Sequence, residues 1–235
     1  MIPKIIHYCW FGKKEKPPLA KKCISSWKKL LPDYSIVEWN EKNFPINIYP
    51  YALYCLKEKK YAFLSDYVRL IVIYEEGGIY FDTDVELKKR PDALLRNEAF
   101  FCFENDSYVA TGLGFGAEKN HITIKKMIEM YSALVPDQSG DFPLYTCPRL
   151  NTEALVLLGL KRNGQMQMVC GAIILPSDYL NPYDDPTGTL RLTNNTISIH
   201  WYGKSWMKKS RILRSKIMKP FHRWFGVDAF QRFRK

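Results

Sequence analysis

Membrane-spanning and secretory segments are missing from the 235-residue sequence. It has no run of about 18 or more apolar residues and therefore no predicted membrane-spanning helix. Its start, Met1-Ile2-Pro3-Lys4, has neither the apolar stretch nor the small-residue cleavage site of a signal peptide. We therefore expect the chain to fold and remain on the cytoplasmic side. Internal repeats and low-complexity linkers are also missing, which favours one domain followed by a tail.

Closely spaced cysteines are absent as well. The six cysteines are widely spread, and no C-x-x-C pair occurs. This spacing disfavours a zinc ribbon and a thioredoxin-type redox motif. We expect mostly buried, reduced thiols, which is typical of a cytoplasmic protein.

Acidic residues are scarce at the C-terminal end. Residues 204–235 contain eleven Lys or Arg and a single acid, Asp228. They carry +10 of the formal net charge of +11, so the preceding 203 residues carry only +1. A neutral body with a basic tail weakens the hypothesis that the whole protein binds nucleic acid. The body itself is globular in composition, since 46% of the chain is hydrophobic.

Strand and helix patterns alternate along the body, which is typical of α/β proteins with a parallel sheet covered by helices. A first βαβ unit is predicted from a strand over 4–10, a helix over 19–30 and a strand over 35–39. The clearest apolar stripe predicts a helix over 61–76 that ends at Gly77-Gly78. A short buried strand over 79–81 follows it. Weaker patterns predict strands at 99–103, 168–175 and 196–200, and helices at 122–134 and 153–161.

Asp82 and Asp84 directly follow the predicted strand at 79–81. Side chains at i and i+2 of an extended chain lie on the same face, so the two carboxylates can converge on one point. They repel each other unless a cation lies between them, and oxygen ligands suit Mg²⁺ or Mn²⁺. The pair therefore predicts a metal site at the carboxyl end of a strand, where open α/β sheets bind ligands. Two solvated acids at a strand end are the alternative interpretation.

Two further polar groups accompany this pair. Asp66 and Arg69 are three residues apart on the predicted helix, hence on one face, and their acceptors and planar donors suit sugar hydroxyls. An ordinary surface ion pair would give the same spacing. His200 ends the last predicted strand and could supply a metal ligand. Gly203 and Lys204 follow it and could contact phosphates. A packed histidine beside aromatic residues is the alternative.

The stretch Ser65-Asp66-x-x-Arg69, followed by Gly77-Gly78-Ile79-Tyr80-Phe81-Asp82-Thr83-Asp84, resembles the family of glycosyltransferases whose sugar-binding region contains a DXD motif. That family is similar to yeast-type mannosyltransferases, bacterial capsular polysaccharide transferases and the glucosylating domain of large clostridial toxins. Residues 2–12 resemble its amino-terminal strand, which contacts the nucleotide. With both ends included, the resemblance covers residues 1–206.

The resemblance implies a GT-A fold over residues 1–206, with a mixed, mostly parallel central sheet. It also implies a UDP- or GDP-linked sugar donor, a divalent metal (Mn²⁺ or Mg²⁺) and retention of the anomeric configuration. The metal ligands would be Asp82, Asp84 and His200. The donor would be bound by His7, Trp10, Asp66, Arg69, Tyr80, Asp82, Gly203, Ser205 and Trp206. Catalysis would rest on Asp82, Asp84, Arg69 and Lys204, with Lys204 and the metal stabilising the leaving diphosphate.

The chain departs from the family at two places. Thr146-Cys147-Pro148 stands where relatives often have Thr-Gly-Pro, and His121-Ile122 stands where a relative has His-Pro. The residue before a proline is restricted to extended conformations in any case, so a cysteine is tolerable there. We expect both departures to affect the acceptor side and to leave the donor side intact.

The tail, residues 207–235, alternates aromatic and apolar residues with Lys and Arg. Pro220 and Gly226 interrupt the apolar stripe, which favours two short amphipathic pieces over one long helix. Such a tail is typical of a segment that binds an anionic membrane surface, here the inner face of the membrane, and a solvated charged terminus is the alternative.

Three functional hypotheses remain from the sequence. The first is a hexosyltransferase that moves a sugar from a nucleotide-sugar donor to a glycan or lipid-linked acceptor in polysaccharide biosynthesis, such as that of a capsule, with no nucleic-acid partner. The second is a basic-tailed nucleic-acid-binding module. The third is a metal-dependent hydrolase of nucleotide sugars.

Overall fold

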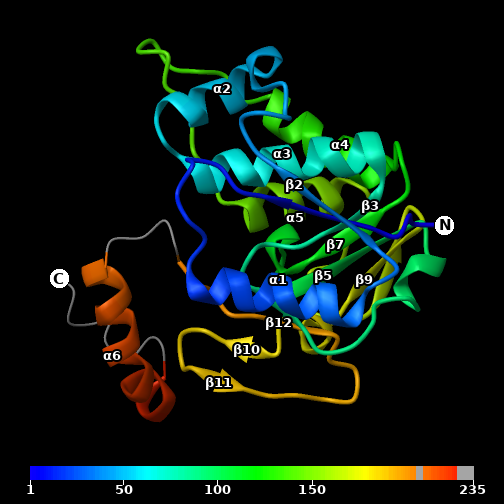
Figure 1. Cartoon of the computed structure of the whole chain (residues 1–235), viewed down its shortest axis with the longest axis vertical. Coiled ribbons are helices and arrows are strands. Elements are labelled where there is room, and N and C mark those ends of the chain that lie inside the picture. The colour runs from blue at the N-terminus through cyan, green and yellow to red at the C-terminus, as the bar shows by residue number, and fades with distance from the viewer. Residues whose placement is uncertain (205–208, 227–235) are drawn as a thin grey trace.

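The computed structural model describes residues 1–204 and 209–226. They form a layered α/β fold in which helices cover both faces of a mixed central sheet (Figure 1). The helices are α1 (Pro18–Leu30), α2 (Pro50–Lys57), α3 (Tyr61–Glu76), α4 (Ile122–Ser132), α5 (Cys147–Leu157) and α6 (Lys209–Phe225). The strands of the central sheet are β1 (Ile5–Cys9), β2 (Ser35–Trp39), β3 (Gly78–Tyr80), β5 (Ala99–Asn105), β6 (Tyr108–Val109), β7 (Phe115–Ala117), β8 (Gln167–Val169) and β9 (Ala172–Leu175). Two smaller sheets pair β4 (Val85–Leu87) with β12 (Ser198–His200) and β10 (Tyr183–Asp184) with β11 (Thr189–Leu190).

The first βαβ unit is confirmed. β1 runs parallel to β2, with Ile5 opposite Ser35, and parallel to β3 on its other side, with Ile6 opposite Ile79. Because these three strands run in one direction, their carboxyl ends meet at one edge of the sheet. The residues that follow β1, β2 and β3 in the chain are therefore gathered at that edge.

The rest of the central sheet is mixed. Its order is β2-β1-β3-β7-β5-β9-β8, with β6 paired to β5. β5 is parallel to β9, whereas β7 is antiparallel to both β3 and β5, and β8 is antiparallel to β9. The predicted α/β class with a mixed central sheet is confirmed.

Helix α3 lies on one face of the sheet together with α2, α4 and α5 (Figure 1). It spans the predicted residues, and its side chains are buried on almost every side, including Leu64, Val68 and Ile73. Gly77 ends it with φ of 67°, a conformation that glycine adopts without steric cost. The chain then turns directly into β3, so α3 and β3 bring their polar residues to the same end of the sheet.

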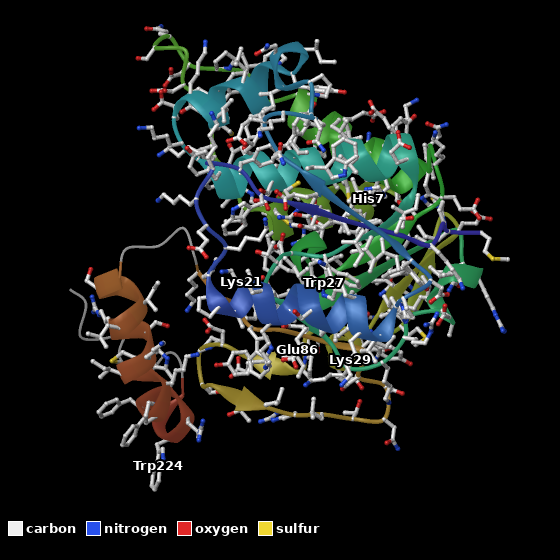
Figure 2. All side chains as sticks on the ribbon, in the orientation of Figure 1. His7, Lys21, Trp27, Lys29, Glu86 and Trp224 are labelled. Carbon is white, nitrogen blue, oxygen red and sulfur yellow. The ribbon has the colours of Figure 1, made fainter. Side chains whose placement is uncertain are left out.

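Helix α1 covers the opposite face, where it packs on β4 (Figures 1 and 2). Trp27 is fully buried there and donates a hydrogen bond from its indole N–H to the carbonyl of Val85 at 2.8 Å. Burying a tryptophan is worth several kcal/mol, on the order of 3–5 by truncation. Since Val85 follows Asp84 directly, this contact fixes the segment that carries the two aspartates.

Several expected elements differ in the structure. The single strand expected over 168–175 is wrong, because Cys170 and Gly171 adopt positive φ and separate β8 from β9. The helix expected over 153–161 begins earlier and ends at Leu157, and α2 was not predicted. The tail expected as two short helical pieces is, within the described residues, one helix that continues through Pro220. No helix among residues 1–204 and 209–226 is both long enough and apolar enough to cross a membrane.

Candidate metal and donor site

The two aspartates lie in the short link between β3 and β4, at the carboxyl edge of the parallel strands. Strand β12 pairs antiparallel with β4 and places His200 opposite Val85. The late histidine thereby reaches the aspartates from more than a hundred residues further along the chain. One potential ligand atom from each of Asp82, Asp84 and His200 lies within 4.8 Å of the other two. The structure thus brings together the three residues expected to bind a metal.

Asp84 is held in place by His200 at the end of β12 and by Gly203 just after it. Its Oδ1 lies 3.2 Å from His200 Nε2, and its Oδ2 accepts a hydrogen bond from the Gly203 backbone N–H at 2.6 Å. Burial alone would raise the pKa of Asp84, but His200 and the Gly203 N–H outweigh it and lower that pKa to about 2. Asp84 is therefore an anion with a fixed orientation at neutral pH.

Asp82 is oriented from the side of α3. Arg69 Nη2 donates to its Oδ1 at 3.0 Å, and the Tyr80 hydroxyl donates to the same oxygen at 3.0 Å. The same Arg69 nitrogen lies 2.7 Å from Asp66 Oδ1. The Arg69 side chain is 3% exposed and its guanidinium lies over the Tyr80 ring, 4.9 Å from the centroid. The Asp66–Arg69 pair is therefore a buried part of the site, not a surface ion pair.

The residues present fit a divalent cation. Burial raises the pKa of Asp82, and the negative charge of Asp84 raises it further, so a cation between them would relieve this repulsion. The donor set of two carboxylates and an imidazole suits Mn²⁺. His200 Nδ1 is buried without a hydrogen-bond partner among the described residues, which leaves Nε2 as the atom facing the carboxylates.

A buried polar network behind Arg69 was not predicted. Thr111 Oγ1 accepts a hydrogen bond from Asn151 Nδ2 at 2.8 Å and lies 3.4 Å from Arg69 Nη1. Cys147 Sγ lies 3.2 Å from Thr111 Oγ1 and 3.9 Å from Arg69 Nη1. We expect the departure from Thr-Gly-Pro at Cys147 to affect the acceptor side, but the structure places Cys147 behind the arginine that orients Asp82. The other departure, His121, caps α4 and pairs with Thr123.

Gly112 was also missed by the sequence patterns. A Cβ atom there would lie 2.6 Å from Asp82 Oδ2 and 3.2 Å from Arg69 Nη1. The position therefore needs glycine because a side chain would displace the carboxylate. No short motif contains this information, since the contact joins segments that are thirty residues apart.

The predicted donor contacts include His7 on β1 and Trp10, which directly follows β1. His7 is 2% exposed, and both ring nitrogens are occupied: Trp39 Nε1 donates to Nδ1 at 3.0 Å, and Nε2 lies 3.0 Å from the Gly77 carbonyl. Burial lowers the pKa of His7 to about 4, so it stays neutral at pH 7. The structure therefore gives His7 a structural role. Trp10 follows β1 at the carboxyl edge, is partly buried, and donates its indole N–H to the Lys14 carbonyl.

A cavity of about 390 Å³ opens at the same edge, beyond the ends of β1 and β2. Its lining residues are Gly12, Lys13, Glu41, Leu56 and Tyr61. Gly12 follows β1, Glu41 follows β2, and the aspartates follow β3, so the cavity and the candidate metal site share one edge of the sheet.

Lys204 extends toward α6. Its ammonium lies 2.6 Å from the Asp185 carboxylate and donates to Ser215 Oγ at 2.9 Å. Gly203 is at the site through its hydrogen bond to Asp84. The predicted contacts of Ser205 and Trp206 lie outside the described residues and remain predictions.

Parts of the chain are similar to two yeast proteins. Inositol phosphoceramide mannosyltransferase 3 of Schizosaccharomyces pombe is 33% identical over 127 residues, which cover 51% of this chain and 34% of that protein. Mannosyl phosphorylinositol ceramide synthase CSH1 of Saccharomyces cerevisiae is 32% identical over 107 residues, which cover 43% of this chain and 27% of that protein. The matches span about a third or less of the length of these relatives.

The fold is shared with a solved structure. The PaToxG glycosyltransferase superposes with a TM-score of 0.52 and 22% sequence identity, covering 66% of this chain and 69% of that chain. At this identity the likeness is one of fold, and the predicted GT-A-type fold is confirmed.

The segment that carries the site also matches a family description. Residues 17–101 match the glycosyltransferase sugar-binding region containing a DXD motif. This segment contains α3, β3 and both aspartates, which the structure joins to His200 in one cluster. Residues 17–101 of this chain are therefore similar to the sugar-binding region of glycosyltransferases that contain a DXD motif.

Proposed function

We propose that this chain is a metal-dependent, retaining hexosyltransferase. It moves a sugar from a UDP- or GDP-linked donor to a glycan or lipid-linked acceptor in polysaccharide biosynthesis. The observation that carries the proposal is the convergence of Asp82, Asp84 and His200 at the carboxyl edge of the sheet, together with the match of residues 17–101 to a sugar-binding region. The family match favours this hypothesis over a nucleic-acid-binding module.

The chain's own residues have separate tasks in the reaction. Asp82, Asp84 and His200 would hold Mn²⁺ or Mg²⁺, which neutralises charge on the diphosphate as it leaves. Arg69 keeps Asp82 ionised and oriented, because it is the buried cation between that carboxylate and Asp66. Lys204 would add its ammonium to the leaving diphosphate, which is electrostatic stabilisation of the departing group.

The geometry agrees with a reaction that needs no separate base. Each of the three buried carboxylates near the site is already paired: Asp66 and Asp82 with Arg69, and Asp84 with His200. Asp84 is a weak proton acceptor because His200 and the Gly203 N–H lower its pKa. Burial raises the pKa of Asp66 and Asp82, but both carboxylates stay engaged with Arg69. We infer that a diphosphate oxygen takes the acceptor proton on the same face, which retains the anomeric configuration.

The donor would lie along the carboxyl edge of the parallel strands. Its diphosphate would be at the aspartates, its sugar near Asp66 and Arg69, and its nucleoside toward the cavity that Gly12 and Tyr61 line. The two yeast relatives are named for mannosyl transfer to an inositol phosphoceramide. Their names support a hexose donor, with mannose as the first sugar to test, and a lipid-linked acceptor.

A panel of nucleotide sugars tests this proposal. Thermal unfolding is measured with each donor in the presence and absence of Mn²⁺, followed by assays for transfer to glycan acceptors and for release of free sugar. A bound donor raises the unfolding temperature by mass action, so at least one UDP- or GDP-linked sugar should do so only with metal. Release of free sugar alone, with every acceptor inactive, would favour the hydrolase. No metal-dependent shift with any donor would contradict the proposed function.

We also propose that the protein binds an anionic membrane surface on its cytoplasmic side, through helix α6. This helix contains six Lys or Arg and no acid. Leu213, Ile217 and Trp224 are 60%, 57% and 82% exposed, at spacings that share one side of the helix. Figure 2 shows Trp224 pointing away from the body. Exposed apolar residues flanked by basic ones are typical of helices that lie in a membrane interface. Such a position would bring the donor site near a lipid-linked acceptor.

Vesicle co-sedimentation tests the membrane proposal. Serine at Leu213, Ile217 and Trp224 together should abolish most binding to anionic vesicles, because burial of these side chains supplies the salt-resistant attraction. The matched control places serine at Val135, Leu157 and Met168, which are similarly exposed on the body, and should bind like the wild type. Equal binding by both triple variants would contradict the membrane role.

A further inference from the structure

Lys204, the lysine proposed to meet the diphosphate, is already paired within the protein. Its side chain is 19% exposed and that of Asp185 is 16% exposed, with 2.6 Å between the ammonium and the carboxylate. Ser215 on α6 accepts a second hydrogen bond from the same ammonium. A largely buried ion pair holds its members firmly, since parting them leaves a charge without a partner. In this conformation Lys204 is neutralised by Asp185.

Asp185 has a second cation beside it. Lys219 Nζ of α6 lies 3.0 Å from the Asp185 carboxylate and donates to the Tyr183 hydroxyl at 2.6 Å. Asp185 would therefore keep an ion-pair partner if Lys204 moved away. This sharing lowers the cost of releasing Lys204, because the carboxylate is not left alone.

The backbone between the metal site and Lys204 is strained. Tyr202 has φ of 49° and Lys204 has φ of 51°, and neither is a glycine. Such residues cost on the order of 1 kcal/mol or more each and often occur in segments that switch between conformations. Gly203, between them, donates its N–H to Asp84. A cavity of about 220 Å³ borders Lys204, Asp185 and Ser215, so the lysine side chain has room to turn.

We propose that Asp185, with Ser215, forms a latch that holds Lys204 away from the diphosphate until the donor binds. The inference rests on the proposed function, because it needs a diphosphate at the metal site. The diphosphate competes with Asp185 for the Lys204 ammonium, and on binding Lys204 leaves Asp185 to Lys219. Asp185 is then a positioning residue that acts through Lys204, and it lowers the affinity for diphosphate by the cost of opening the latch.

Calorimetry with Mn²⁺ and inorganic pyrophosphate tests the latch on the full chain. Pyrophosphate is the probe because every nucleoside-diphosphate donor contains its two phosphates. Asp185→Asn should bind about tenfold more tightly than the wild type, since Lys204 is then free before the ligand arrives. Asp184→Asn is the matched control: it removes the same charge from the exposed neighbouring residue, and its affinity should stay at the wild-type value. With Lys204→Met in place, Asp185→Asn should give no gain.

The outcomes separate the latch from the metal site. A gain in affinity cannot arise from a poorly folded variant, so it supports the latch directly. Unchanged or weaker binding by Asp185→Asn, or a gain that persists with Lys204→Met or also appears with Asp184→Asn, would overturn it. If the wild type does not bind pyrophosphate with Mn²⁺, or Asp84→Ala binds it equally well, the proposed metal site fails and the latch fails with it.

Discussion

The donor site and α6 differ in how their charged residues are arranged. At the site, Asp66, Asp82 and Asp84 are largely buried, and each is paired with Arg69 or His200 before any ligand binds. On α6 the basic residues have no acid within the helix and border exposed apolar side chains. The site is thus organised in advance for one ligand geometry. The helix instead presents a surface whose contributions should add residue by residue and respond to salt.

This difference predicts where single substitutions act strongly. A buried, mutually paired cluster fails when one member is removed, because the remaining charges lose their partners. In an exposed helix, a substitution removes only the contribution of that one residue to the binding free energy. The expected effects therefore run from orders of magnitude at the aspartates to a few-fold on α6.

The largest effect is expected at Asp84. Asp84→Ala removes a metal ligand and the acceptor of the Gly203 N–H, so transfer should fall by about 10³-fold and Mn²⁺-dependent donor binding should disappear. The fold should survive, because the side chain is 20% exposed at the edge of the sheet. Activity assays and circular dichroism check both parts. Full activity in a folded variant would remove the metal assignment and the contrast with α6.

Arg69 should give the next largest effect. Arg69→Lys keeps the charge but loses the planar fork that reaches Asp66 and Asp82 together. Turnover should fall by about 10- to 100-fold, and the affinity for the bare nucleoside diphosphate should change much less. Steady-state kinetics measure the turnover, and calorimetry measures the affinity for the nucleoside diphosphate. An equal fall in turnover and nucleotide affinity would show that Arg69 acts on the nucleotide or only on the fold.

His7 lies next to the site, on β1 opposite Tyr80 of β3. Its folded pKa of about 4 lies below the unfolded value near 6.5, so the unfolded chain takes up the proton first. The stability from neutral His7 is complete above pH 6.5 and is lost as the pH falls toward 4, by up to about 3 kcal/mol. His7→Gln can make the same hydrogen bonds with Trp39 and Gly77 without titrating. Urea unfolding between pH 7.5 and 4.5 should show a shallower pH dependence in that variant. Identical dependence in both proteins would contradict a buried, neutral His7.

The smallest effect is expected on α6. Arg214→Gln should weaken binding to anionic vesicles by about fivefold at low salt, which corresponds to about 1 kcal/mol for one basic residue near such a surface. The difference should shrink as salt rises. Lys125→Gln, on α4, is an exposed charge-matched control and should bind like the wild type. An all-or-none loss with Arg214→Gln would show that α6 is a specific, organised site like the donor site.

Local patterns predicted the parts of the molecule that depend on local sequence. The βαβ start, the extent of α3 and the end of α3 at Gly77 follow from apolar spacing and from glycine at a helix end. The Asp82–Asp84 pair was recognisable because both residues follow one buried strand. His200 could be linked to them only through the resemblance to a family, since the β4–β12 pairing that joins them is a long-range contact.

Local sequence patterns do not reveal a residue's role where long-range contacts decide it. His7 lies in a motif that resembles a nucleotide-binding strand, yet Trp39 and Gly77 from other strands enclose it. The contacts of Cys147 and Gly112 with Arg69 and Asp82 join distant segments and leave no spacing signal.

The same limit applies at the C-terminal end. Asp185 meets Lys204 and Lys219 only because α6 folds back onto the β10–β11 hairpin, so its position could not be read from neighbouring residues. Pro220 led to the expectation of a break, but the helix continues through it to Phe225. Propensity alone was outweighed there by the contacts that α6 makes with the body.

Two distant parts of the chain, Asp82-Thr83-Asp84 and His200, are proposed to build one metal site. Electron paramagnetic resonance of bound Mn²⁺, titrated with pyrophosphate into the wild type and His200→Ala, tests it most directly. We expect stoichiometric Mn²⁺ binding in the wild type and an affinity for Mn²⁺ that is lower by about 10- to 100-fold in a folded His200→Ala variant. Equal Mn²⁺ affinity and identical spectra in the two proteins would contradict it.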